Sequence, residues 1–162
     1  MATMSKRLEW LKGTFNVECM LSQNTNSMYQ NGVNTQFKSG SLQTSASLNS
    51  NVWAWLDVAY RAQYNINSLE IGAMKTRTRL FTQELELTLM PTDALNFSFS
   101  TEHYANFFND ATRKQTLFAD FNCLYKYRKT DFTLHINNIL NQRYYNNTTY
   151  NNLSRVIQLI PS

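Results

Sequence analysis

Glycine and charged residues are scarce in this sequence, and both shortages exclude classes of protein. With 4 glycines among 162 residues, a glycine-rich phosphate-binding loop is excluded. Charged residues make up 16%, below the roughly 25% of ordinary soluble proteins. No apolar run reaches the ~18 residues of a membrane-spanning helix. Residues 1–13 also lack the apolar segment of a secretory signal peptide.

Few residues have the spacing that a metal site or a catalytic site requires. Cys19 and Cys123 fall on the apolar phase of alternating segments, which favours buried or lipid-facing thiols over a disulfide or a metal site. His103 and His135 have no cysteine or carboxylate at metal-ligand spacing. Nucleophile elbows are absent as well. The sequence therefore predicts no enzyme, no metal and no cofactor.

Uncharged polar and aromatic residues are abundant instead. Aromatic residues make up 14% of the chain, and asparagine, glutamine, serine and threonine are common. This composition is typical of a wall that is wet on one side and apolar on the other. The net charge is +4, but lysine and arginine are scattered, so a nucleic-acid partner is not expected. A single domain over residues 1–162 is the natural expectation for this length.

Apolar and polar residues alternate along most of the chain, the pattern of β-strands with one apolar face. The alternation is longest over residues 52–64 and equally clean over 132–136. It predicts an all-β, antiparallel up-and-down meander of about nine to ten strands, each of roughly ten residues. This is the strand length of a transmembrane β-barrel, of which the chain would form an incomplete segment. The strands are predicted near residues 11–21, 28–38, 42–48, 52–64, 69–73, 81–89, 95–101, 117–127 and 132–136.

Turn chemistry predicts where the strands reverse. Short turns are expected after Phe37, Tyr64, Met90 and Tyr127, and longer polar loops after Leu21, Tyr104 and Asn138. This contrast is imperfect, because the reversals expected near residues 49–51 and 75–77 are short as well. Short turns on one side and longer loops on the other are typical of outer-membrane barrels. Within this scheme the basic segment 75–79 is expected to be a solvated loop, with contact to anionic lipopolysaccharide as the alternative.

The same alternation assigns side chains to two environments. Charged residues on the polar phase are predicted to line a water-filled lumen, where a carboxylate pair belongs to a solvated wall more readily than to a glycosidase-like site. These candidate lumen residues are Asp57, Arg61, Glu84, Glu86, Glu102, Asp120, Lys126 and His135. Aromatic residues on the apolar phase, next to predicted short turns, are expected to form a girdle at one membrane interface. The candidate girdle residues are Phe37, Tyr60, Tyr64, Tyr125, Tyr127 and Phe132.

One short segment near the end of the chain carries a motif. An asparagine-rich corner follows the strand at 132–136, and asparagine suits a turn because it tolerates left-handed backbone and hydrogen-bonds its own main chain. The motif residues are Asn137, Asn138, Leu140, Asn141, Tyr144 and Tyr145. This segment resembles a C-terminal motif of TonB-dependent outer-membrane receptors, especially those of Bacteroidetes. The resemblance covers about ten residues.

The resemblance implies a non-catalytic part of a receptor barrel that takes up substrate across the bacterial outer membrane. Its partners would be outer-membrane lipid, the remainder of the barrel, a plug, and TonB through an N-terminal part. The chain carries no plug domain, and it ends in Pro161-Ser162 where the family ends in an aromatic residue. The chain is therefore expected to be a piece of a larger receptor. The alternatives are a soluble all-β binding module, such as a carbohydrate-binding sandwich, or a truncated frame without independent function.

Overall fold

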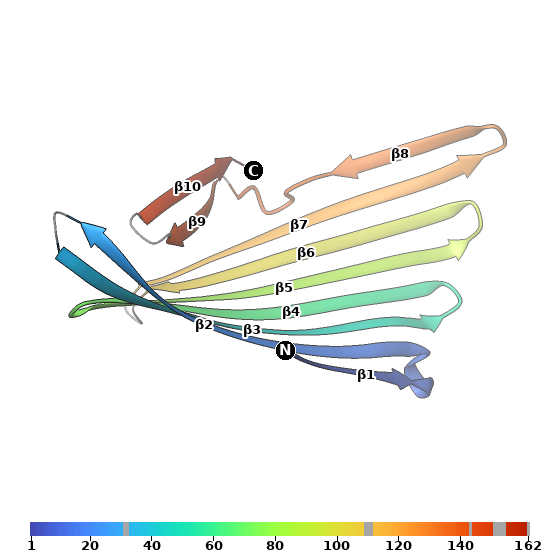
Figure 1. The fold of residues 1–162 in the computed structure, drawn as a ribbon. Coiled ribbons are helices and arrows are strands. Elements are labelled where there is room, and N and C mark those ends of the chain that lie inside the picture. The colour runs from blue at the N-terminus through green and yellow to red at the C-terminus, as the bar shows by residue number, and fades with distance from the viewer. Residues whose placement is uncertain (31–32, 109–111, 143, 151–154, 162) are drawn as a thin grey trace.

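A computed structural model describes residues 1–30, 33–108, 112–142, 144–150 and 155–161 (Figure 1). The described residues form ten β-strands and one short 3-10 turn, η1. No helix among them is long and apolar enough to cross a lipid bilayer. The elements are β1 (Ala2–Leu8), η1 (Glu9–Leu11), β2 (Gly13–Gln30), β3 (Val33–Trp53), β4 (Leu56–Ile71), β5 (Met74–Thr92), β6 (Leu95–Phe108), β7 (Thr112–Tyr127), β8 (Thr130–Ile136), β9 (Tyr144–Tyr150) and β10 (Arg155–Pro161).

The strands form an antiparallel meander, which confirms the predicted fold class. β1 to β8 make one sheet in which every strand pairs with the next strand along the chain. β9 and β10 pair with each other in a separate two-stranded sheet. The large sheet is not closed, and β1 and β8 are its edges (Figure 1). Hairpin order follows from local turns, so the meander needs no long crossover.

Strands β2 to β7 are longer than the alternation predicted, whereas β1, β8, β9 and β10 have 7 residues each. β3 has 21 residues and β2 has 18, against an expected length of roughly ten. The expected turn after Phe37 lies inside β3, and the expected turn after Tyr64 lies inside β4. The segment 75–79, expected to be a loop, is part of β5. Serine and asparagine in these stretches pair across strands, as Ser22 does with Ser41, so they extend the ladder rather than ending it.

Three connections at one end of the sheet consist of two residues each. They link Trp53 to Leu56, Thr92 to Leu95 and Tyr127 to Thr130, and η1 lies at the same end (Figure 1). We call this the tryptophan end, because residues 10, 53 and 55 are tryptophans. The reversals predicted after Met90 and Tyr127 are confirmed here.

At the opposite, far end, β4 and β5 are joined through Gly72 and Ala73 alone. Gly72 has a φ of 58°, the left-handed conformation that glycine adopts at little cost. The prediction of longer loops after Leu21 and Tyr104 is wrong, because β2 continues to Gln30 and β6 continues to Phe108. Residues 31–32 and 109–111, which include part of the second expected loop, lie outside the described residues. The predicted contrast between short and long connections is therefore not found at Gly72.

The large sheet is a single layer, and it has almost no core. In the described part of the chain, the buried side chains are those of Ala105, Ala119 and Ser50. Large apolar side chains stay exposed, including Leu134 at 53% and Phe132 at 56%. Burial of apolar area is the main force that stabilises a folded chain. The sheet therefore offers apolar surface that the described residues do not cover.

Strand register divides the sheet into two faces. One side of the sheet carries Arg61, Glu84 and Glu102, which are directly opposite one another on β4, β5 and β6, and we call this side the polar face. We call the apolar face the other side, where Val58, Leu87, Phe99, Phe121 and Ile136 stand in one row. Cys19 and Cys123 lie on the apolar face, because Cys19 is opposite Thr44 and Cys123 opposite Leu134.

Apolar residues occupy a band rather than the whole apolar face. On β4 the band runs from Leu56 to Ile66, every second residue of which is apolar or aromatic. Beyond Ile66 the same face continues with Ser68 and Glu70. The band is thus close to the length of about 9–11 residues that a tilted strand needs to cross a bilayer. The strands extend well past it toward the far end.

Candidate functional site

The eight candidate lumen residues all share the polar face. The register places Arg61, Glu84 and Glu102 in one row, and Glu86 with Asp120 in the next row toward the tryptophan end. Asp57 and His135 lie in a further row, connected through Thr88, Ser98 and Asn122. Lys126 is on the same side of β7, opposite Asp131. Because side chains alternate strictly along a strand, the sequence pattern alone was enough to group these residues.

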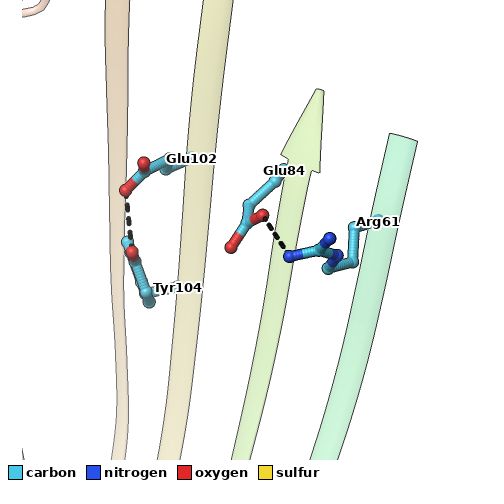
Figure 2. Close-up of polar contacts among 4 residues, drawn as sticks. All are labelled: Arg61, Glu84, Glu102 and Tyr104. Carbon is cyan, nitrogen blue, oxygen red and sulfur yellow. Dashed lines mark hydrogen bonds and ion pairs between the residues drawn. The ribbon is translucent and has the colours of Figure 1, made fainter. Parts of the chain in front are cut away.

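The centre of the polar face holds charged and phenolic groups that remain open to solvent. Arg61 Nη1 lies 3.7 Å from Glu84 Oε2, and both side chains are about half exposed, at 63% and 48% (Figure 2). On the neighbouring strand the Tyr104 hydroxyl donates a hydrogen bond of 2.7 Å to Glu102 Oε2. An exposed ion pair of this kind contributes about 0–1 kcal/mol. These contacts leave the four groups in reach of solvent.

Two hollows open on the polar face and share Arg61. Their walls are made mainly of carboxylates, amides and hydroxyl groups, so they present hydrogen-bonding groups to water or to a polar solute. One is lined by Ser47, Asn49, Ala59, Tyr60, Arg61, Glu84 and Glu86. The other is lined by Asn16, Glu18, Gln43, Ser45, Ser47, Arg61 and Gln63.

Two further lumen candidates have amide partners. The Asn51 side-chain amide donates to Asp57 Oδ1 at 2.5 Å, across the β3–β4 hairpin. His135 Nδ1 lies 2.5 Å from Asn122 Oδ1 on β7. Among the described residues, no group of three or more histidines, cysteines or carboxylates is arranged to hold a metal ion.

The asparagine-rich corner is built around Asn138. Its backbone is left-handed, with a φ of 52°, and its side chain makes two reciprocal bonds with Gln142. The Asn138 amide Nδ2 donates to Gln142 O, and Gln142 N donates to Asn138 Oδ1, each at 2.8 Å. Asn141 is also left-handed, with a φ of 50°. This confirms that asparagine forms the turn leaving β8 by bonding its own main chain.

Two bonds fix this corner to β7. Asn138 N donates to Asp120 Oδ1 at 2.6 Å, and Ile139 N donates to Ala119 O at 2.8 Å. Asp120 therefore acts as an anchor of the corner as well as a member of the polar face. The corner ends β8 opposite Phe121, so the remainder of β7 continues without β8 beside it. Tyr144 and Tyr145 begin β9, and their side chains lie outside the described part.

The structure separates the six candidate girdle residues. Tyr125, Tyr127 and Phe132 gather at the tryptophan end, where Tyr125 is 6.4 Å from each of the other two ring centroids. Tyr60 and Tyr64 lie on the apolar face but within the band, because the turn expected next to Tyr64 does not exist. The placement of Phe37 is wrong. It pairs with Ile71 near the far end, and it shares a phase with Ser39 and Ser41, on the polar side.

The predicted girdle did not include the tryptophans. Trp53 and Trp55 stack across the β3–β4 connection, with ring centroids 5.1 Å apart and planes inclined by 6°. Trp10 lies in η1 at the same end and is 80% exposed. All 3 tryptophans of the chain are thus at one end of the sheet. Residues 52–55 lay inside an expected strand, and only the correct turn position would have revealed this group.

Comparison with protein-family models, with curated proteins and with solved structures finds no match for this chain.

Proposed function

We propose that this chain is a wall segment of a β-barrel in a bacterial outer membrane, with no catalytic role. The observation that carries the proposal is the uncovered apolar band on a single-layer sheet. Leu134, Phe132 and Ile136 are each more than two-fifths exposed, although the Phe132 ring stacks on Tyr125 of the neighbouring strand. A soluble protein rarely leaves so continuous an apolar surface open. Lipid tails would cover it, while the polar face would meet water.

Two other features support lipid as the cover. The band has about the length that a barrel strand needs to cross the hydrocarbon layer. Aromatic residues also gather where the band ends, with Trp53, Trp55, Tyr125, Tyr127 and Phe132 at the tryptophan end. Tryptophan and tyrosine favour the membrane interface, because the ring is apolar and its edge can hydrogen-bond. In this arrangement the tryptophan end would face the periplasm, the side of short turns.

The specific proposal is a TonB-dependent receptor that takes up substrate. It rests on the resemblance of the motif from Asn137 to Tyr145, and the hydrogen-bonded corner at Asn138 gives that motif a defined geometry. The open edges β1 and β8 would pair with further barrel strands, because unpaired edges expose backbone donors and acceptors. A plug and TonB would be the functional partners, and the outer membrane the location.

The native cysteines provide the test. Cys19 and Cys123 lie on the apolar face, so in lipid vesicles they should be protected from a membrane-impermeant maleimide. In a parent with both cysteines changed to serine, Ser98→Cys and Ser100→Cys on the polar face should react readily. Equal labelling of Cys123 and of the cysteine replacing Ser100 would contradict the proposal. A monodisperse, cooperatively melting protein in plain buffer would favour the soluble sandwich instead.

A further inference from the structure

On the apolar face, basic residues replace apolar ones where the band ends toward the far end. Arg79 stands directly opposite Ile66 on β4 and Phe107 on β6, in the last row that contains apolar residues. Arg77 and Lys75 follow on the same side of β5, because they are two and four residues further along the strand. The band is therefore bordered by three cations in succession on one strand.

A fourth cation joins this group through the sheet register. Lys38 on β3 is opposite Glu70 on β4, and Glu70 is opposite Lys75 on β5, so all three share the apolar face. Lys75 Nζ forms an ion pair with Glu70 Oε1. The hydrogen bond and the charge of Lys75, with a smaller contribution from Lys38, hold the pKa of Glu70 below its ordinary value. We call Lys38, Lys75, Arg77 and Arg79 the basic border.

Acidic residues are divided unequally between the two faces. Among the described residues of β1 to β8, Glu70 is the one acidic residue on the apolar face. The polar face carries Glu18, Asp57, Glu84, Glu86, Glu102, Asp120 and Asp131. The basic border thus places four cations next to the apolar band, with Glu70 as the one described carboxylate on that face.

We propose that the basic border binds the phosphate groups of anionic lipid headgroups. The inference rests on the proposed membrane location of the apolar band. If lipid tails cover the band, the headgroup layer lies level with the row of Arg79, Ile66 and Phe107. Arginine pairs with phosphate in a two-pronged geometry, and lysine adds a point charge. The basic border lies on the side of the band away from the tryptophan end, so the proposed site belongs to the leaflet at the far end.

The test compares vesicle binding of the 162-residue chain and two triple variants. One removes cations of the basic border, as Lys75→Gln, Arg77→Gln and Arg79→Gln. The matched control removes the same charge from the polar face, as Arg7→Gln, Lys114→Gln and Lys126→Gln. Partitioning is measured by flotation into phosphatidylcholine vesicles, and into the same vesicles with about one fifth phosphatidylglycerol. A third arm adds inorganic phosphate at matched ionic strength.

The expected result is a gain from phosphatidylglycerol that the border variant loses and the control keeps. Each basic residue near an anionic surface is worth about fivefold in partitioning, the equivalent of about 1 kcal/mol. The border variant should therefore lose on the order of tenfold or more. Glu70→Gln should raise the gain severalfold, in the opposite direction from the border variant. Circular dichroism in vesicles checks that strand content is unchanged.

Three outcomes would overturn the inference. The first is no gain from phosphatidylglycerol, and the second is an equal loss in both triple variants. The third is a gain abolished by inorganic phosphate at constant ionic strength, which would assign the residues to free phosphate. Failure of the proposed function would give a different result. The chain would not bind vesicles of phosphatidylcholine alone, and Cys19 and Cys123 would react with the maleimide.

Discussion

The half of the sheet next to the tryptophan end and the half next to the far end belong to the same strands, yet they differ in what their side chains face. On β3 the apolar face carries Leu48, Ala46 and Leu42 near the tryptophan end, and Lys38 and Gln36 further along. The pairing of β3 with β2 runs without a shift from Ser50 to Val33. Strand continuity is therefore set by backbone pairing, while the side chains change with the surroundings.

This difference shows that backbone pairing and an apolar environment are separate requirements, although the alternation pattern combines them. A strand needs backbone partners, which Ser41 and Asn67 provide for each other as well as valine or leucine would. An apolar band needs an apolar environment, and under the proposed function it stops where the hydrocarbon layer stops. The substitutions below act on one half and leave the other as the internal control, in order of decreasing expected effect.

The largest effect is expected from an arginine within the band. Leu48→Arg places a guanidinium between Phe15 and Tyr60, its partners on β2 and β4. In a lipid-facing position this costs about 2–4 kcal/mol near mid-depth. Gln36→Arg lies on the same face of the same strand in the far half, and should change stability by less than about 0.5 kcal/mol. Denaturant unfolding in vesicles measures both, and equal losses would contradict a difference between the halves.

Two glycines at opposite ends should respond differently to alanine. A Cβ on Gly13 would lie 2.5 Å from Asn49 O and 2.9 Å from Ser50 Cβ, so β2 and β3 would have to separate there. Overpacking of this kind costs about 1–3 kcal/mol.

Gly72 has open space around it, and only its φ of 58° opposes a side chain. Gly72→Ala should cost about 1 kcal/mol, and Gly72→Asn less, because asparagine tolerates this backbone. Denaturant midpoints give both values. If Gly13→Ala were no worse than Gly72→Asn, the tight approach of β2 to β3 would be refuted.

A smaller effect is expected at the corner that ends β8. Asn138→Ala removes both side-chain bonds with Gln142 and leaves a left-handed backbone that alanine disfavours. The loss should be about 1–1.5 kcal/mol. Asn138→Asp keeps the acceptor for the Gln142 N–H and should cost less. Amide exchange of Gln142 and Ile139 measures the local effect. Unchanged exchange at Gln142 in Asn138→Ala would show that the reciprocal bonds do not hold the corner.

The smallest effect concerns the exposed pair of Glu70 and Lys75. Lys75 lowers the pKa of Glu70 in the folded protein, so the pair stabilises the fold at a pH above the ordinary carboxyl value of 4.5. The contribution is lost as the pH falls through the lowered pKa. The stability difference between the parent and Lys75→Gln should thus be small at neutral pH and vanish in acid. A difference that grows in acid would have the wrong sign for this pair.

The sequence was sufficient for the features that depend on neighbouring residues. The period of two grouped Arg61, Glu84 and His135 on one face, and turn chemistry located the reversals at 91–94 and 128–129. It was not sufficient for strand ends at the far half, because serine and asparagine favour turns only when no partner strand accepts them. The pairing of Ser41 with Ser22 and Asn67 is not local. That error also misplaced Phe37 and hid the group formed by Trp53 and Trp55.

The placement of Trp10, Trp53 and Trp55 has an optical consequence. The chain has 3 tryptophans and all lie at one end, so its tryptophan fluorescence reports on that end and responds little to changes in the far half. The nearly parallel rings of Trp53 and Trp55 are close enough to couple their electronic transitions. A coupled circular-dichroism signal would then arise only while the β3–β4 connection is intact. The protein thus contains a built-in probe that distinguishes opening of one end of the sheet from loss of the whole.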